Sequence, residues 1–161
     1  MKKSILRLTI LLAVVFALPV SGVAIPISGT GSYGSFTGEM TYNGGLLNIY
    51  LRNTSPEVNG GYITAFVFNN PGNLALTGFE YIGPEGSSFY ARSADNGING
   101  PPYGRFDFLA STENRDNGFE GPGNPAAGIP VNSYASFTFQ FSGANLADLT
   151  AESFLNAYST T

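Results

Sequence analysis

The sequence predicts an all-β protein, an antiparallel β-sandwich with jelly-roll or immunoglobulin-like topology and about seven to eight strands. Turn-forming residues are abundant, with 21 Gly and 10 Pro. Aromatic residues reach 14% and charged residues only 11%, whereas disordered chains are poor in aromatic residues. Short runs of alternating apolar and polar residues are separated by turn clusters, and no helical segment lies between them.

Residues 1–24 have the pattern of a secretory signal peptide. Basic residues precede an apolar run over residues 11–18, which is followed by Pro19 and a small-residue cleavage site ending at Ala24. The run is shorter than the roughly 20 residues that a membrane span needs. We therefore expect a single β-sandwich domain over residues 25–161 that is secreted, extracellular or at the cell surface, with no stable membrane span.

The charge of the mature part argues against polyanionic partners. All three basic residues of the leader are lost, so four Arg remain against 11 acidic residues, a formal net charge of −7. Phosphate backbones and anionic lipid surfaces are bound by basic surfaces. We therefore expect no nucleic acid partner.

Histidine and cysteine are absent from the whole sequence. This removes the usual general base near neutral pH, and with it the Ser-His-Asp and Cys-His catalytic triads. It also removes thiolate zinc sites and iron–sulfur clusters. The sequence therefore favours a protein that is not an enzyme and has no cofactor, calcium being the one ion that its loops suggest.

The first half of the mature chain is predicted to contain a hairpin and two further strands. Residues 35–42 and 46–53 alternate with period two and flank Asn43-Gly44-Gly45, which predicts a tight turn. The nearly continuous apolar run 62–68 predicts a central strand, or an edge strand under a loop. Residues 76–82 predict a weaker strand.

The second half is predicted to alternate strands with two long loops. Residues 88–92 predict a short edge strand and residues 105–110 a further strand, with a loop over 93–103 between them. A second loop covers 111–130, and irregular segments this long are often functional. The clearest alternation of the chain spans 134–142 and predicts a strand that buries its aromatic face.

A short helix is predicted at the C-terminal end. Thr150 is a residue type that caps helices, and the helix is expected to run through Ala157. Glu152 falls in the first turn, where the helix dipole favours an acidic side chain.

Three stretches carry a family resemblance: residues 45–55 (G-L-L-N-I-Y-L-R-N-T-S), 61–69 (G-Y-I-T-A-F-V-F-N) and 144–155 (A-N-L-A-D-L-T-A-E-S-F-L). They resemble secreted bacterial proteins of the PEP-CTERM type, and cohesin-type modules share the strand style. The resemblance implies a small exported β-sandwich that is associated with the exosortase system and linked to the envelope, biofilm or exopolysaccharide. It supplies no catalytic residue. Residues 157–161 lack the Val-Pro-x-Pro-Glu motif, membrane span and terminal arginines of the PEP-CTERM sorting tail.

Two acidic segments, residues 95–100 and 113–118, are candidate calcium sites. Their carboxylate and amide oxygens are the donors that calcium prefers. Neither segment has EF-hand spacing, because Gly97 and Arg115 stand where ligands are needed. Asp, Asn and Gly also favour turns, so solvated turns are the alternative. The candidate ligands are Asp95, Asn96, Asn99, Glu113, Asp116 and Asn117.

Exposed aromatic rings are candidate platforms for the sugar rings of an extracellular polysaccharide. Tyr90, Tyr103, Phe119 and Tyr134 are expected to be exposed, and Tyr103 and Phe119 in the two long loops form the predicted platform. Most other Phe residues fit the core alternation, and the chain has no Trp.

Four carboxylates, Asp107, Glu113, Asp116 and Glu120, lie close together in the sequence. Glycosidases need only a pair of carboxylates, so these residues suggest a carboxylate-dependent glycoside hydrolase. Solvated surface charges are the alternative.

The Gly-rich segment 25–34 suits self-association. An extended end can complete a neighbour's sheet by β-augmentation, although it is equally explained as a flexible terminus or an ordinary first strand. We predict a non-enzymatic structural or adhesive protein of the bacterial cell surface or extracellular matrix that self-assembles by strand exchange. A carbohydrate-binding module is the second prediction and a glycoside hydrolase the third.

Overall fold

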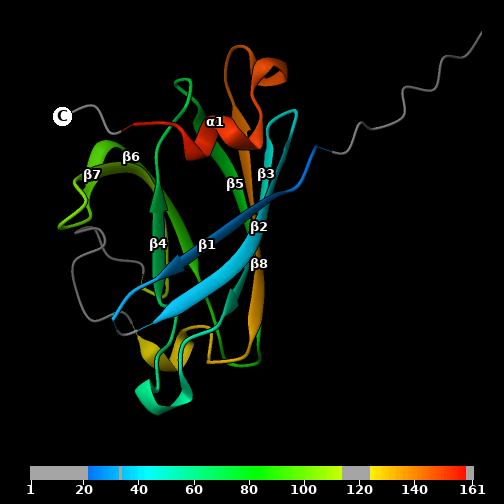
Figure 1. Ribbon diagram of the computed structural model, residues 1–161. Helices are drawn as coiled ribbons and strands as arrows, with labels where there is room; N and C mark the ends of the chain where they lie inside the picture. Colours follow the sequence, from blue (N-terminus) through cyan, green and yellow to red (C-terminus); the bar gives the residue numbers. More distant parts are fainter. Residues whose placement is uncertain (1–21, 33, 114–123, 159–161) are drawn as a thin grey trace, which may run out of the picture.

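Two antiparallel sheets make up the computed structural model, which describes residues 22–32, 34–113 and 124–158 (Figure 1). The larger sheet has the strand order β1-β2-β3-β8-β5 and the smaller one β4-β7-β6. The predicted all-β sandwich with one short helix is confirmed. The strands are β1 (Ile25–Thr30), β2 (Ser35–Asn43), β3 (Leu46–Asn53), β4 (Ala65–Phe68), β5 (Ala75–Ile82), β6 (Tyr90–Asn99), β7 (Arg105–Ser111) and β8 (Tyr134–Ser142).

The predicted hairpin forms between β2 and β3. Asn43 pairs with Leu46, so Gly44 and Gly45 alone make the turn. Both have positive φ, +54° and +100°, which glycine adopts without the steric cost that a Cβ brings. This turn fixes the register that sends Leu47, Ile49 and Leu51 into the core.

Phenylalanine rings from both sheets fill the core. Phe137 and Phe139 of β8 are fully buried, and Phe66 of β4 lies edge-on against Phe137, with ring centroids 4.9 Å apart. Phe108 of β7 contacts Phe141 of β8 at 4.9 Å. Such aromatic pairs add about 0.5–1.5 kcal/mol each beyond the burial of their area. The rings of β8 therefore make contacts that hold the larger sheet against the smaller one.

The predicted loop over 93–103 is wrong, because β6 continues to Asn99. Its register against β7 shifts between Ser93 and Ile98, and Asn96 has a φ of +44°. The Asp-Asn-Gly sequence that suggested a turn therefore forms an irregularity within a strand. Only the residues after Asn99 form the turn to β7.

The first and fourth strands lie at free edges of their sheets. β1 pairs only with β2, so residues 25–30 form an ordinary first strand within the described chain. β4 pairs only with β7, and of the two interpretations of the run 62–68 the edge strand is correct. β4 is shorter than predicted, because Ile63 makes only an isolated bridge to Ile129.

The helix α1 (Ala151–Leu155) covers one end of the sandwich, where it is drawn in red in Figure 1. It begins after Thr150, as predicted, but ends before Ala157. The Thr150 backbone N–H donates to Ser153 Oγ at 3.1 Å, and Phe154 packs against Tyr42 with ring centroids 5.2 Å apart. Three 3₁₀ turns complete the described elements: Glu57–Asn59, Pro125–Ala127 and Leu146–Asp148.

Candidate functional site

An apolar groove of about 530 Å³ lies between the two free edges, β1 and β4. Its volume falls in the range of about 300–1,000 Å³ that is usual for binding pockets. Ser28 is the one polar residue that lines it, and Phe154 and Leu155 of α1 close one end. The other lining residues are Pro26, Ile27, Phe36, Met40, Ile49, Leu51, Ile63, Ala65, Phe66, Val67 and Phe68.

The backbone edges of both strands face this groove. Side chains alternate between the two faces of a strand, so a surface that touches only one face would include every second residue. All four consecutive residues of β4, from Ala65 to Phe68, line the groove, as do Pro26, Ile27 and Ser28 of β1. The groove is therefore bordered by consecutive residues of both edge strands, as a site for strand addition would be.

The chemistry of the groove suits burial of an apolar segment. None of the residues that line it has an ionisable side chain, so it offers no general acid or base. Phe66 and Phe68 turn their rings into the core, where Phe68 contacts Phe139 at 5.0 Å. Val67, between them, points to the opposite face of β4. An incoming strand would find backbone partners at the edge and apolar side chains beside it.

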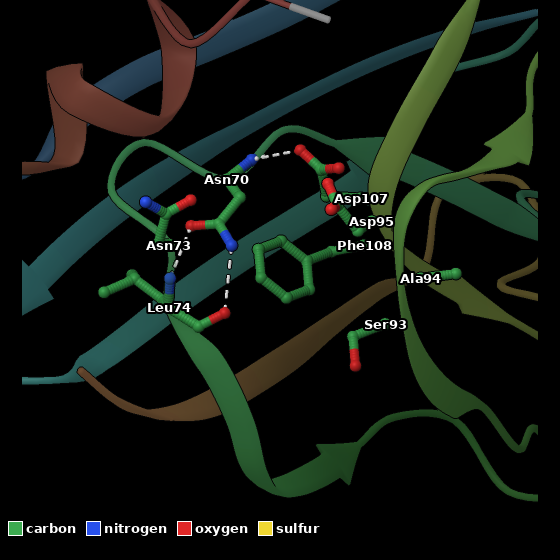
Figure 2. Close-up of a pocket in the computed structure, with 8 residues that line it drawn as sticks. All are labelled: Asn70, Asn73, Leu74, Ser93, Ala94, Asp95, Asp107 and Phe108. Carbon is green, nitrogen blue, oxygen red and sulfur yellow. Dashed lines mark hydrogen bonds between the residues drawn. The ribbon is translucent and has the colours of Figure 1, made fainter. Parts of the chain in front are cut away.

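A second, polar pocket of about 270 Å³ is built around Asp107 of β7 (Figure 2). Asp107 is buried, and its two carboxylate oxygens accept hydrogen bonds from the backbone N–H groups of Asn70, at 2.8 Å, and Asn96, at 2.7 Å. Asn70 in turn bonds the backbone of Leu74 at both its N–H and its C=O, as Figure 2 shows. Asp107 thus ties the 69–74 turn to the irregular part of β6.

The candidate calcium ligands are only partly brought together. Asp95 lines the pocket of Asp107, and Asn96 donates to that carboxylate. Asn99 lies at the end of β6, opposite Arg105. Glu113 follows the far end of β7, where its carbonyl oxygen accepts a bond of 2.6 Å from Ser111. The described part of the chain contains no group of three acidic side chains placed to hold an ion.

Asp116, Asn117, Glu120 and Phe119 lie outside the described residues. Of the four carboxylates of the hydrolase prediction, the structure describes Asp107 and Glu113. Since both oxygens of Asp107 accept backbone N–H groups, the described structure gives that side chain a structural role.

The aromatic side chains proposed as a platform differ in their surroundings. Tyr103 is 81% exposed in the turn after β6, and within the described chain no other ring contacts it. Tyr134 is 60% exposed on β8, and its ring lies against that of Tyr50, an exposed residue of β3 that the sequence analysis did not single out. The alternation of 46–53 places Tyr50 on the outer face and was the signal that could have found it.

Two tyrosines with shifted pKa values belong to the core. Burial raises the pKa of Tyr42, whose hydroxyl donates to the Leu146 carbonyl at 3.1 Å. Burial also raises the pKa of Tyr81, and a hydrogen bond of 2.7 Å to Ser87 opposes the rise. Neither side chain lines the groove or the pocket of Asp107. These shifts follow from packing.

Comparison of the chain with protein-family models, curated proteins and solved structures finds no match. The described residues contain no helix with the length and hydrophobicity needed to cross a membrane.

Proposed function

We propose that the protein is an exported, non-enzymatic structural or adhesive component of the bacterial cell surface or extracellular matrix, and that it self-associates through the groove between β1 and β4. The leader-like residues 1–24 and the PEP-CTERM resemblance support export. The single observation that carries the self-association is the pair of free strand edges facing one apolar groove.

A free strand edge presents unpaired backbone groups with which another chain can pair. Sheets usually protect an edge with a very short strand, a charged side chain, a proline, a bulge or a covering loop. β1 carries Pro26, which has no backbone N–H to offer. β4 is short, at four residues, but its sequence A-F-V-F carries neither a charged residue nor a proline. We therefore place the contact between copies at the β4 edge, where an extended strand of a neighbour extends the smaller sheet.

Strand addition at β4 requires less rearrangement than exchange of β1. Exchange would first separate β1 from β2, to which it is paired along all six residues. Addition at β4 breaks no pairing of the described chain, because that edge has no strand partner within it. The sequence-based prediction of strand exchange is thus refined to strand addition.

A charge on the β4 edge tests the proposal. We expect the mature wild-type protein to form oligomers whose mass, measured by light scattering after size exclusion, rises with concentration. Val67→Lys should remain monomeric, because a charged side chain on an edge strand opposes the addition of a neighbour's strand. Val58→Lys is the matched control, since Val58 is 93% exposed on the 3₁₀ turn after β3, and it should assemble as the wild type does.

A wild-type protein that stays monomeric, or a folded Val67→Lys variant that assembles normally, would contradict the proposal.

A disulfide latch separates the two routes of assembly. Ser28 and Thr37 are paired across β1 and β2, and the natural chain has no Cys, so Ser28→Cys with Thr37→Cys can hold β1 in place. The oxidised latch should leave strand addition intact and block strand exchange, with reduction restoring it.

A further inference from the structure

Two tyrosine rings lie side by side on the outer face of the five-stranded sheet. Tyr50 of β3 and Tyr134 of β8 have ring centroids 5.7 Å apart and planes inclined by 35°. Tyr50 is directly opposite Ser136, so Tyr134 is its diagonal neighbour on the adjacent strand. The two residues are 39% and 60% exposed. This pair, the Tyr50–Tyr134 platform, is held on two paired strands and not on loops.

A hollow of about 430 Å³ adjoins the platform. Ile82 and Pro84 form its apolar far side, and Ile82 is 65% exposed. Asn132 and Ser136 bring polar groups to the lining. The Asn132 side chain is held by a hydrogen bond of 2.9 Å from its amide nitrogen to Glu57 Oε1, so its position at the hollow is fixed.

The platform differs from the rest of this outer face. The next outward position of β3 is polar, and Asn48 there accepts a hydrogen bond of 2.8 Å from Thr138. Tyr42 is buried and Tyr81 is half-buried against core phenylalanines, whereas the platform tyrosines are exposed. Exposed apolar surface of this kind, with polar groups at its border, is typical of a binding site.

The chemistry matches a sugar ring. A pyranose presents an apolar face of C–H groups, which can stack on an aromatic ring, and a border of hydroxyls, which can bond amides and hydroxyls such as those of Asn132 and Ser136. Glu39 is opposite Tyr50 and Arg52 is opposite Tyr134, while Glu57 accepts the hydrogen bond from Asn132 at the hollow, so these charges leave a net negative surrounding. A neutral sugar fits this arrangement better than an anionic one.

We propose that the Tyr50–Tyr134 platform and its adjoining hollow bind the pyranose rings of a neutral polysaccharide. The site is on the outer face of the sandwich, whereas the groove is between β1 and β4, so this inference does not rest on self-association. It moves the predicted platform from Tyr103 and Phe119 to two residues that paired strands hold next to each other.

The test is isothermal titration calorimetry of the mature protein with cellohexaose, xylohexaose, mannohexaose and chitohexaose. We expect at least one of these oligosaccharides to bind. Tyr50→Ala and Tyr134→Ala should each weaken that binding about tenfold or more, the double variant should abolish it, and Tyr134→Phe should retain most of it. Tyr103→Ala is the matched control, because Tyr103 is more exposed than either platform residue and should leave affinity unchanged.

Both platform side chains are exposed, so the variants are expected to keep the wild-type melting temperature, which circular dichroism checks. Absence of binding to all four oligosaccharides would overturn the inference. So would binding that survives in the folded double variant, or binding that is lost in Tyr103→Ala.

Discussion

Asn53, at the end of β3, is fully buried, and its side chain bonds three separate segments. Its amide nitrogen donates to the carbonyls of Gly61, at 3.1 Å, and Ile129, at 2.8 Å, while its Oδ1 accepts the Ser55 N–H at 3.0 Å. A buried polar group left without its partner costs about 1–3 kcal/mol. This one side chain therefore fixes both loops at its end of the sandwich, next to the start of β4.

We expect Asn53→Leu to lower the free energy of unfolding by about 2–4 kcal/mol, because it leaves one buried carbonyl, one half-buried carbonyl and one buried N–H without this partner. Urea unfolding followed by circular dichroism measures the change. Asn48→Ala is the control, since Asn48 is exposed and its hydrogen bond to Thr138 is on the surface, and it should cost under about 1 kcal/mol. Equal effects of the two substitutions would show that Asn53 has no special role.

At the scale of the element, the β2–β3 turn depends on two glycines in different ways. A Cβ at Gly45 would meet the Phe141 carbonyl oxygen at 2.9 Å, and the φ of +100° is strained for any other residue. A Cβ at Gly44 would meet no atom within 4 Å, and its φ of +54° is a conformation that Asn adopts. The turn therefore requires glycine at position 45, whereas position 44 can accept a residue such as Asn.

Gly45→Ala is expected to destabilise the fold by about 1–3 kcal/mol, whereas Gly44→Asn should stay within about 0.5 kcal/mol of the wild type. Thermal unfolding of the two variants, measured side by side, distinguishes them. The reverse order, with Gly44 the more sensitive position, would contradict the turn geometry described above.

Local pattern was enough to predict the elements that alternate clearly. The hairpin and the strand 134–142 were predicted because their periodicity and turn chemistry agree with their tertiary surroundings. Residues 93–99 were predicted as loop because Asp95, Asn96 and Gly97 favour turns; pairing with β7 and the Asp107 hydrogen bond to Asn96 outweigh that preference. Of the surfaces, the outer position of Tyr50 was predictable from alternation, but its contact with Tyr134 depends on strand order, which no local pattern contains.

At the scale of the whole molecule, the sandwich is closed on one side and open on the other. β5 and β6 contact each other where the two sheets meet, and Tyr81 and Phe89 pack there with ring centroids 4.9 Å apart. On the other side, β1 and β4 leave the apolar groove between them. Whether two sheet edges meet or leave a groove depends on how the sheets are packed together. The alternation of a single strand therefore could not predict the groove.

The most direct test places a spin label at the groove. The natural chain has no Cys, so Val67→Cys and Val58→Cys each give a single labelling site. With increasing unlabelled wild-type protein, the electron paramagnetic resonance spectrum of the Val67 label should broaden as a neighbour's strand immobilises it, while the Val58 label stays mobile. A Val67 spectrum that does not change while light scattering reports assemblies would contradict the account, as would the absence of any assembly.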